Sequence, residues 1–367
     1  MRIFFILAFA GLGGILVPLS LKAQGSNHTA NPSYNDGPYI FYENGQVLAR
    51  WTTKEGLQEK AIHAGQPLEI DAGTSASFDP SYLDVNDSFQ ASSKTAFNGV
   101  EHIAAVSDIH GQYDLLLDLL KAHRIIDESG NWAFGEGHLV VLGDIFDRGD
   151  EVTDLLWFVH NLEKQAEKAN GQVHYLLGNH EIMALQGDLR YIHKKYRYTM
   201  ARMGMPYNEL FGENTYLGRW LRSKPVAISI NKTAFVHAGF SEALLDQKLS
   251  FADMNQAFQE KIIGQLEDSI VADPILGLLY SEYGPVWYRG YFDEGFAKWQ
   301  AQAILSKIRK KHIIVGHTSF SEIVSLFRNR IIGIDSSIKL GKKGEILLID
   351  KNKFYRGTLD GERIRLK

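Results

Sequence analysis

The chain has 367 residues, of which 45% are hydrophobic and 22% charged, so it is long enough to form one large domain or two. Its formal net charge is −4, from 39 basic and 43 acidic residues, and this balance gives no electrostatic reason to expect nucleic acid or an anionic membrane as a partner. The sequence has no cysteine, which excludes disulfides, thiolate metal sites and cysteine nucleophiles. Any transition metal must therefore be held by His, Asp, Glu or Asn.

Residues 1–24 are typical of a secretory signal peptide. One positive charge precedes an apolar run that continues to Leu21, and polar sequence follows. We expect cleavage near Ala23 or Gln24 and an exported protein, periplasmic or secreted, with no stable membrane span after cleavage. The alternative is an uncleaved N-terminal membrane anchor, because an apolar run of roughly 18 residues approaches the length that spans a bilayer.

Residues 25–98 form an N-terminal extension in which no cluster of His or acidic residues indicates chemistry. After a polar leader, two strand-like runs between Tyr39 and Thr53 flank Asn44-Gly45, the strongest short-range signal for a β-hairpin. We expect a small β-rich unit that packs on the main domain; a separate binding module is the alternative.

From residue 99 onward one sequence pattern recurs five times. Each copy is a continuous apolar run of strand length that ends in small residues and then His, Asp or Asn. Continuous apolarity predicts strands buried on both faces, and helical periodicity between them predicts an α/β fold with its site beyond the carboxyl ends of the strands. The five segments are EHIAAVSDIHG (101–111), HLVVLGDIFDRG (138–149), QVHYLLGNHE (172–181), KTAFVHAGF (232–240) and KHIIVGHTSF (311–320), and helices are expected at 113–125, 151–169 and 296–309.

Two further strands and two inserts complete the main domain, residues 99–367. RIIGIDSS (330–337) and GEILLID (344–350) are predicted to be strands, and the second follows so closely that antiparallel pairing with the first is expected. The inserts, at about 182–225 and 241–300, lie between site-bearing strands, and we expect them to form a helical cap over the site.

The polar residues at the strand ends form one candidate site, whose members are Asp108, His110, Asp144, Asn179, His180, His237 and His317. A single histidine of this kind is more often a satisfied core residue, but five strand ends with the same pattern argue against coincidence. A sulfur-free set of Asp, His and Asn suits a pair of divalent ions such as Mn, Fe, Zn or Co. Two ions about 3.5–4 Å apart need a shared carboxylate. Asp144 is the natural bridge, since Gly143 before it permits a tight turn.

Together, SDIHG, GDIFDRG, GNHE, HAG and GHT resemble the motifs of the calcineurin-like metallophosphoesterases, and among these the phosphoprotein phosphatase branch. GPVWYRGY (284–291) is similar to a segment of the bacterial-like members called Shewanella-like phosphatases. The resemblance covers about residues 100–340. It implies a β-sandwich of two mixed sheets flanked by helices, and a metal-dependent phosphomonoesterase that acts on phosphorylated proteins, peptides or small phosphomonoesters. The branch's C-terminal regulatory motif is not visible, so no regulatory subunit is expected.

The resemblance also assigns six residues to two divalent metal ions. The first ion would be bound by Asp108 and His110, the second by Asn179, His237 and His317, and Asp144 would bridge the two. A hydroxide that bridges the ions would attack phosphorus in line, without a phospho-enzyme intermediate. Manganese is the ion expected to support activity in vitro.

The remaining assigned residues would contact the substrate. His180, oriented by Asp147, would donate a proton to the leaving oxygen. Arg148 and Arg289 would bind the phosphate, whose geometry a guanidinium matches in bidentate fashion, and Asn179 is expected to contact the substrate as well. Asp147 also separates this branch from the purple acid phosphatases, which have a tyrosinate ligand at that position.

Several alternatives stay open at this point. A dinucleoside-polyphosphate or nucleotide hydrolase would use the same metal site beneath a different cap. A non-catalytic exported binding protein would show gaps among the ligands, and this sequence shows none. If Arg289 does not bind phosphate, it would be a cap arginine in an ion pair. The Lys, Arg and Tyr residues of 191–202 would either favour anionic or aromatic substrates or form a solvated helix face. A preference for phosphotyrosine would follow from the resemblance to plant members of the Shewanella-like group.

Overall fold

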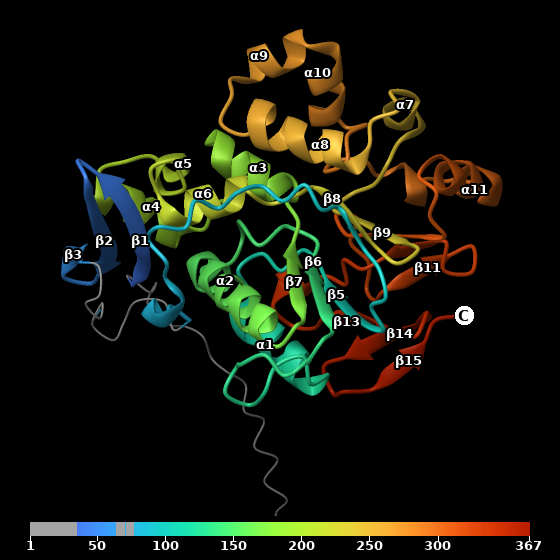
Figure 1. Ribbon diagram of the computed structural model, residues 1–367, viewed down its shortest axis with the longest axis horizontal. Coiled ribbons are helices and arrows are strands. Elements are labelled where there is room, and N and C mark those ends of the chain that lie inside the picture. Colours follow the sequence, from blue (N-terminus) through green and yellow to red (C-terminus); the bar gives the residue numbers. More distant parts are fainter. Residues whose placement is uncertain (1–34, 64–69, 71–76) are drawn as a thin grey trace, which may run out of the picture. The chain divides into compact units, whose positions relative to one another are not determined.

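The structure is a computed structural model that describes residues 35–63, 70 and 77–367. Two six-stranded sheets form the main domain, and a three-stranded sheet precedes them in the chain (Figure 1). The expected signal peptide, residues 1–24, lies outside the described residues. Within the described part of the chain, no helix combines the length and the apolarity that crossing a bilayer requires.

One six-stranded sheet carries the first three of the five recurrent motifs. Its order is β15-β14-β13-β5-β6-β7, in which β5, β6 and β7 are parallel and the other three strands are antiparallel to their neighbours. Because β5, β6 and β7 run in one direction, the polar loops after them meet at one edge of the sheet. The bounds are β5 His102–Val106, β6 His138–Val141, β7 Gln172–Tyr175, β13 Glu345–Asp350, β14 Lys353–Thr358 and β15 Arg363–Arg365.

The second six-stranded sheet carries the other two motifs. Its order is β11-β12-β10-β9-β8-β4, in which β9, β10 and β12 are parallel neighbours. Its last strand, β4, comes from the range assigned to the N-terminal extension, so that range contributes a strand to the main domain. The bounds are β4 Ala96–Phe97, β8 Ala227–Ile230, β9 Thr233–Val236, β10 His312–Val315, β11 Val324–Leu326 and β12 Ile331–Gly333.

The expected antiparallel pairing of β12 with β13 is wrong. β12 pairs in parallel with β10, whereas β13 pairs antiparallel with β5 in the other sheet. The connection between β12 and β13, which includes the 3₁₀ turn Ile338–Leu340, leads the chain from one sheet to the other. Closeness in sequence does not determine the partner of a strand, because an apolar run can pair with any strand whose register it matches.

The hairpin expected around Asn44-Gly45 is present. β1 (Asp36–Glu43) pairs antiparallel with β2 (Gln46–Thr53), and β3 (Gly56–Ile62) extends this sheet. Asn44 and Gly45 have φ angles of 50° and 76°, as a type I′ turn requires.

A buried carboxylate on β1 attaches the three-stranded sheet to the main domain. Asp36 is 2% exposed and accepts hydrogen bonds from Thr153 Oγ1 at 2.8 Å and Thr199 Oγ1 at 2.7 Å. Lys195 Nζ lies 3.7 Å from Asp36 Oδ1 and donates to the carbonyl oxygen of Asp150 at 2.8 Å. The sheet is therefore connected to the loop that follows the GDIFDRG motif.

Helices flank the sheets, and α1 and α2 lie against the sheet that contains β5, β6 and β7 (Figure 1). The three helices expected from periodicity are observed as α1 (Tyr113–Ala122), α2 (Val152–Lys168) and α11 (Lys298–Lys307). Both inserts are largely helical. The first insert begins within α3 (Asn179–Gln186), whose first residues belong to the GNHE motif, and contains α4 Lys194–Met203, α5 Tyr207–Leu210 and α6 Tyr216–Arg222. The second contains α7 Glu242–Asp246, α8 Phe251–Ala257 with a π-helical turn Phe258–Ile262, α9 Glu267–Ala272 and α10 Pro274–Tyr280.

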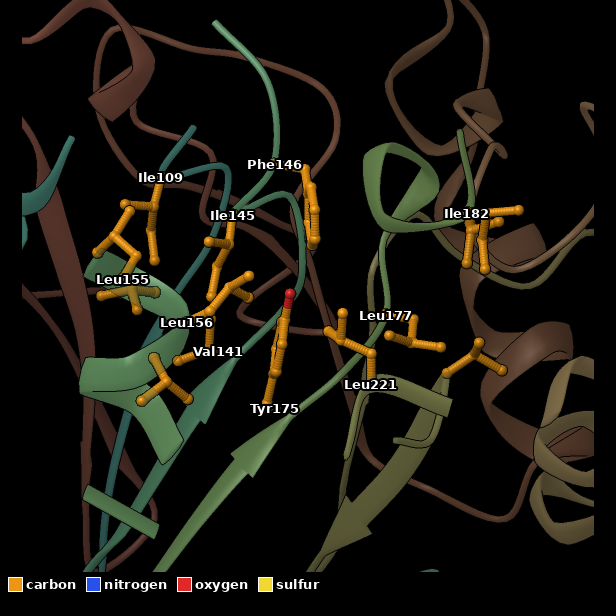
Figure 2. Packing of buried hydrophobic residues seen from close by; sticks show 14 of the residues in the cluster. Ile109, Val141, Ile145, Phe146, Leu155, Leu156, Tyr175, Leu177, Ile182 and Leu221 are labelled. Carbon is orange, nitrogen blue, oxygen red and sulfur yellow. The ribbon is translucent and has the colours of Figure 1, made fainter. Parts of the chain in front are cut away.

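Apolar residues inside the motif loops anchor these loops in the core. Ile109, Ile145 and Phe146 stand directly beside the polar motif residues in sequence, and each is 0% exposed. Figure 2 shows them in one packed cluster with Leu155 and Leu156 of α2. Burying a side chain of this size contributes about 1.5–3 kcal/mol. The loops that carry the polar residues are therefore held by the core.

Candidate functional site

The loops after β5, β6, β7, β9 and β10 bring the seven strand-end residues together. All seven are at most 4% exposed. His110, Asp144 and His180 form one group whose potential ligand atoms lie within 4.8 Å of one another, and Asp144, His237 and His317 form a second. Asp144 belongs to both groups, as a carboxylate shared by two adjacent cations would.

Asp144 is the electrostatic centre of the site. Its Oδ2 lies 3.4 Å from His237 Nε2, 3.6 Å from His110 Nε2 and 3.9 Å from His180 Nε2. Burial alone would raise the pKa of Asp144, but His237 and His180 hold it well below its usual range. Burial alone would likewise lower the pKa of His237, but the Asp144 carboxylate raises it to about 9. Asp144 is therefore an anion at neutral pH.

Carbonyl oxygens fix the orientation of two histidine rings. His110 Nδ1 lies 2.7 Å from the carbonyl oxygen of Phe146, and His237 Nδ1 lies 2.5 Å from that of Leu142. Because a carbonyl oxygen can only accept, each Nδ1 carries a proton, and Nε2 is the atom directed to a ligand. His110 Nε2 is buried without a hydrogen-bond partner among the described residues, and burial lowers the pKa of His110 to about 3. A neutral imidazole with a free lone pair beside a carboxylate fits a divalent cation.

Asn179 and His317 complete the second group. Asn179 Oδ1 lies 3.0 Å from His237 Nε2, so the amide oxygen faces the same space as the imidazole. His317 Nε2 donates to the carbonyl oxygen of Trp287 at 3.1 Å, which leaves Nδ1 for a ligand. Burial, with smaller contributions from His237 and Arg289, lowers the pKa of His317 to about 2. His317 is therefore neutral at pH 7, whereas His237, with its pKa raised to about 9, would release a proton when an ion binds.

Asp108 stands apart from both groups. Its Oδ2 accepts hydrogen bonds from Ser107 Oγ at 2.5 Å and from the His317 backbone N–H at 2.9 Å. Burial, followed by Asp335 and Asp144, raises its pKa well above the usual value. The structure thus brings Asp108 to the site, but the group that contains His110 has His180 rather than Asp108 as its third member.

His180 and Asp147 form a close pair. His180 Nδ1 lies 2.6 Å from Asp147 Oδ2, and both side chains are buried. A carboxylate on Nδ1 orients the ring and leaves Nε2 free to act on a bound molecule. Since His180 also belongs to the group with His110 and Asp144, its position suits a proton donor or a metal ligand.

The two predicted phosphate-binding arginines are exposed at the site without an acidic partner. Among the described residues, neither Arg148 nor Arg289 forms an ion pair, which removes the alternative interpretation of Arg289 as a paired cap arginine. Arg289 Nη1 donates to the carbonyl oxygen of His317 at 2.8 Å. The Arg148 guanidinium lies 5.1 Å from the centre of the Tyr191 ring, and its backbone N–H donates to the Tyr191 carbonyl oxygen at 3.0 Å.

Sequence reasoning assigned no role to Glu181, and it considered Tyr191 only as part of the run 191–202 that would favour anionic or aromatic substrates. The structure places both residues at the site. Glu181, the last residue of GNHE, is fully buried; its Oε2 accepts from the backbone N–H groups of Asp144 and Gly178, and its Oε1 from that of Ile145, each at 2.7 Å. The sequence did contain a signal for Glu181, because a glutamate three residues after the residue that precedes a helix is typical of a side chain that caps the helix start. Tyr191 is 45% exposed, and its ring centre lies 5.3 Å from that of His180.

Many of the site residues have left-handed backbone conformations. The φ angles lie between 49° and 70° for Asp108, His110, Asp144, Asp147, Arg148 and His317. Such a conformation costs roughly 1–2 kcal/mol per non-glycine residue, an amount that burial of the neighbouring Ile109, Ile145 and Phe146 can offset. Gly143 has φ 82°, and a Cβ there would collide with the backbone of Gly178. Strain concentrated at one cluster of polar residues is characteristic of a functional site.

The calcineurin-like phosphoesterase family matches residues 101–321, a segment that contains every residue assigned to the site. The chain belongs to this family. Calcineurin-like phosphoesterases use divalent metal ions, and the His and Asp groups described above suit such ions. The protein is therefore a metal-dependent phosphoesterase, and its fold of two mixed sheets flanked by helices, with a β-rich sheet before them, confirms the expected fold class.

Similar proteins place this phosphoesterase among the phosphatases of the family. The crystal structure of a cold-active protein-tyrosine phosphatase from a psychrophilic Shewanella species is 41% identical, covers 91% of this chain and 99% of that chain, and has a TM-score of 0.84. Shewanella-like protein phosphatase 1 of Plasmodium berghei is 30% identical over 65% of this chain and 67% of its own length. An uncharacterized protein of Schizosaccharomyces pombe is 30% identical over 77% of this chain and 89% of its own length. The resemblance to Shewanella-like phosphatases is confirmed.

Proposed function

We propose that this phosphoesterase hydrolyses phosphate monoesters of proteins and peptides, with His180 as the proton donor to the leaving oxygen. The observation that carries the proposal is the 2.6 Å pair of His180 Nδ1 and Asp147 Oδ2, with His180 Nε2 3.9 Å from Asp144 Oδ2. A histidine held by a carboxylate can keep the proton that a departing alkoxide needs. Arg148, which has no acidic partner among the described residues, is available for the phosphate oxygens.

The proposed metal site uses the residues around Asp144. His110 would bind one ion, and Asn179, His237 and His317 the other, with Asp144 shared between them and Asp108 completing the set. When bound, divalent ions would offset the phosphate charge and lower the pKa of an attacking water. We propose manganese for assays, because oxygen and imidazole donors without sulfur suit it.

The first test of this function is a panel of substrates with and without metal. Purified protein with Mn²⁺ is expected to hydrolyse p-nitrophenyl phosphate and at least one of a phosphotyrosine and a phosphoserine peptide. EDTA should abolish the activity and Mn²⁺ should restore it, because the bound ions would offset the phosphate charge and lower the pKa of the attacking water. Phosphate release measures the result. Hydrolysis of diadenosine tetraphosphate without hydrolysis of any monoester would contradict the proposal and favour a dinucleoside-polyphosphate hydrolase.

We also propose that the protein is exported. The support is the sequence of residues 1–24, with its single positive charge before an apolar run and small residues near Ala23. Mass spectrometry of the mature N-terminus from the native host would identify cleavage near Ala23 or Gln24. An intact Met1 in protein from the membrane fraction would instead support the anchor.

We propose a preference for phosphotyrosine over phosphoserine, to which Tyr191 contributes. One relative is named a protein-tyrosine phosphatase, and the partly exposed Tyr191 ring lies beside both His180 and Arg148. The phenyl ring of a phosphotyrosine substrate, positioned with its leaving oxygen at His180, would pack against the Tyr191 ring. The methylene group of phosphoserine is too small to make this contact. An aromatic pair contributes about 0.5–1.5 kcal/mol. Tyr191→Ala is therefore expected to lower the ratio of kcat/KM for phosphotyrosine over phosphoserine peptides about fivefold.

Matched variants distinguish stacking from a general loss of activity. Tyr191→Phe should keep the ratio, because the ring remains. Tyr283→Ala removes a tyrosine of similar exposure, 49%, from another segment and should also keep it. An equal loss on both peptides in Tyr191→Ala would show instead that Tyr191 positions Arg148.

A further inference from the structure

A row of basic residues lies at the edge of the second six-stranded sheet opposite to the active site. The parallel neighbours β9, β10 and β12 begin directly after Lys232, Lys311 and Arg330. The Lys311 backbone N–H donates to the Lys232 carbonyl oxygen at 2.8 Å, so these residues are adjacent. Neighbouring strands are about 4.8 Å apart, which places three cations in a closely spaced row. The carboxyl ends of β9 and β10 lead instead to His237 and His317.

Two cavities lie beside Lys310, the residue before Lys311, and Lys310 lines both. The first has a volume of ≈ 650 Å³ and is also lined by Lys248 and Arg309; the second, of ≈ 560 Å³, is also lined by Arg328 and Arg330. We call Lys232, Arg309, Lys310, Lys311, Arg328 and Arg330 the basic edge. Cations near a helix C-terminus are favoured by the helix dipole. The helix dipole explains why cations are favoured just after α11, at Arg309, Lys310 and Lys311. It does not explain Lys232, Arg328 and Arg330, which follow no helix.

The positive charge of the basic edge is not compensated within the described part of the chain. Asp246 is the one acidic residue among the described residues that line the two cavities, and its carboxylate is 2.6 Å from Lys307 Nζ. No member of the basic edge has an ion-pair partner among the described residues. Burial, followed by the charge of Lys232, lowers the pKa of Lys310. An unpaired cluster of cations on a chain with net charge −4 is a surface that an anion would stabilise.

The first cavity also offers an apolar wall. Leu249, Phe251 and Ile308 line it and are half-buried, so part of each side chain faces the cavity. This apolar surface is concave. Neither cavity is lined by any of the large hydrophobic side chains that are exposed in the described part of the chain. A membrane would need apolar side chains that protrude, and single-stranded nucleic acid would need a series of stacking rings. An extended peptide supplies acidic and apolar side chains together.

We propose that the basic edge and its two cavities bind an acidic peptide segment that carries an apolar anchor residue. The acidic side chains would pair with Lys310, Lys311 and Arg330, and the apolar residue would enter the cavity beside Phe251. Such a contact would hold a protein partner at a distance from the active site. Because it does not involve the metal ligands, it does not depend on the proposed phosphatase chemistry.

Binding of unphosphorylated peptides tests the proposal independently of catalysis at the active site. Fluorescence anisotropy would be measured in 0.15 M NaCl with a fluorescein-labelled peptide of alternating Glu and Leu and with its Gln counterpart. The acidic peptide should bind saturably and the Gln peptide much more weakly. Lys310→Glu and Arg330→Glu should each weaken binding about tenfold, because each replaces an attraction by a repulsion. Hydrolysis of p-nitrophenyl phosphate should be unchanged, which shows that the variants are folded.

The control is Lys353→Glu, which makes the same charge change at an exposed position of β14 in the other sheet. It should leave peptide binding unchanged. Equal weakening by Lys353→Glu, equal binding of the Gln peptide, or no saturation up to about 1 mM would each overturn the proposal. Binding of a DNA oligonucleotide or of phosphatidylglycerol vesicles without binding of the acidic peptide would overturn the assignment to a peptide.

Discussion

His180→Asn is expected to lower kcat for a phosphoserine peptide by about 10²–10⁴-fold while the metal content of the protein stays the same. Proton donation by a positioned side chain contributes a factor of this size, and His180 is positioned by the 2.6 Å contact with Asp147. The loss should be much smaller on p-nitrophenyl phosphate, whose leaving group departs without a proton. Steady-state kinetics on both substrates and metal analysis by inductively coupled plasma mass spectrometry measure these outcomes.

The metal analysis separates the two roles that the geometry allows for His180. Because His180 groups with His110 and Asp144, loss of one ion in His180→Asn would identify it as a ligand rather than a proton donor. Full activity on phosphoserine with both ions present would exclude both roles. His102→Asn is a suitable control, since His102 is a half-exposed histidine that pairs with Asp350 outside the site.

Glu181→Gln is expected to destabilise the fold by about 2–4 kcal/mol and to weaken Mn²⁺ binding. The Glu181 carboxylate accepts backbone hydrogen bonds on both oxygens, from Asp144 and Gly178 on one and from Ile145 on the other. Glutamine would turn an NH₂ group toward one of these sets of N–H groups. Each buried group left without an acceptor costs about 1–3 kcal/mol. The backbone of Asp144, and with it the shared carboxylate, would lose its support.

Urea unfolding and calorimetric titration with Mn²⁺ measure the two effects. Glu163→Gln serves as the control, because Glu163 is a half-buried carboxylate that bonds Lys224 and Trp220 away from the site. It should lower stability without changing Mn²⁺ affinity. If Glu181→Gln kept the stability and the metal affinity of the unchanged protein, Glu181 would not be the residue that positions Asp144.

The local sequence determined the five strands that carry the motifs, the first hairpin and the seven strand-end residues. A continuous apolar run of about four to eight residues bounded by small and polar residues favours a strand buried on both faces, so β5, β6, β7, β9 and β10 were predictable from the local pattern. Asn44-Gly45 adopts positive φ at low cost, and this local property determined the first hairpin. Polar residues directly after buried strands need partners, and this requirement identified the seven strand-end residues, although their chemical roles came from the resemblance to a family.

Only the tertiary structure decided how these parts are combined. An apolar run does not by itself specify its partner strand. The division of the five motifs between two sheets, and the separate partners of β12 and β13, therefore depend on contacts far apart in sequence. The same holds for Glu181, whose partners include Asp144 and Ile145 on another loop. The basic edge forms for this reason too, because Lys232, Lys311 and Arg330 become neighbours only when three strands pair in parallel. Residue type determines what chemistry a side chain can perform, and the long-range pairing of strands determines which side chains perform it together.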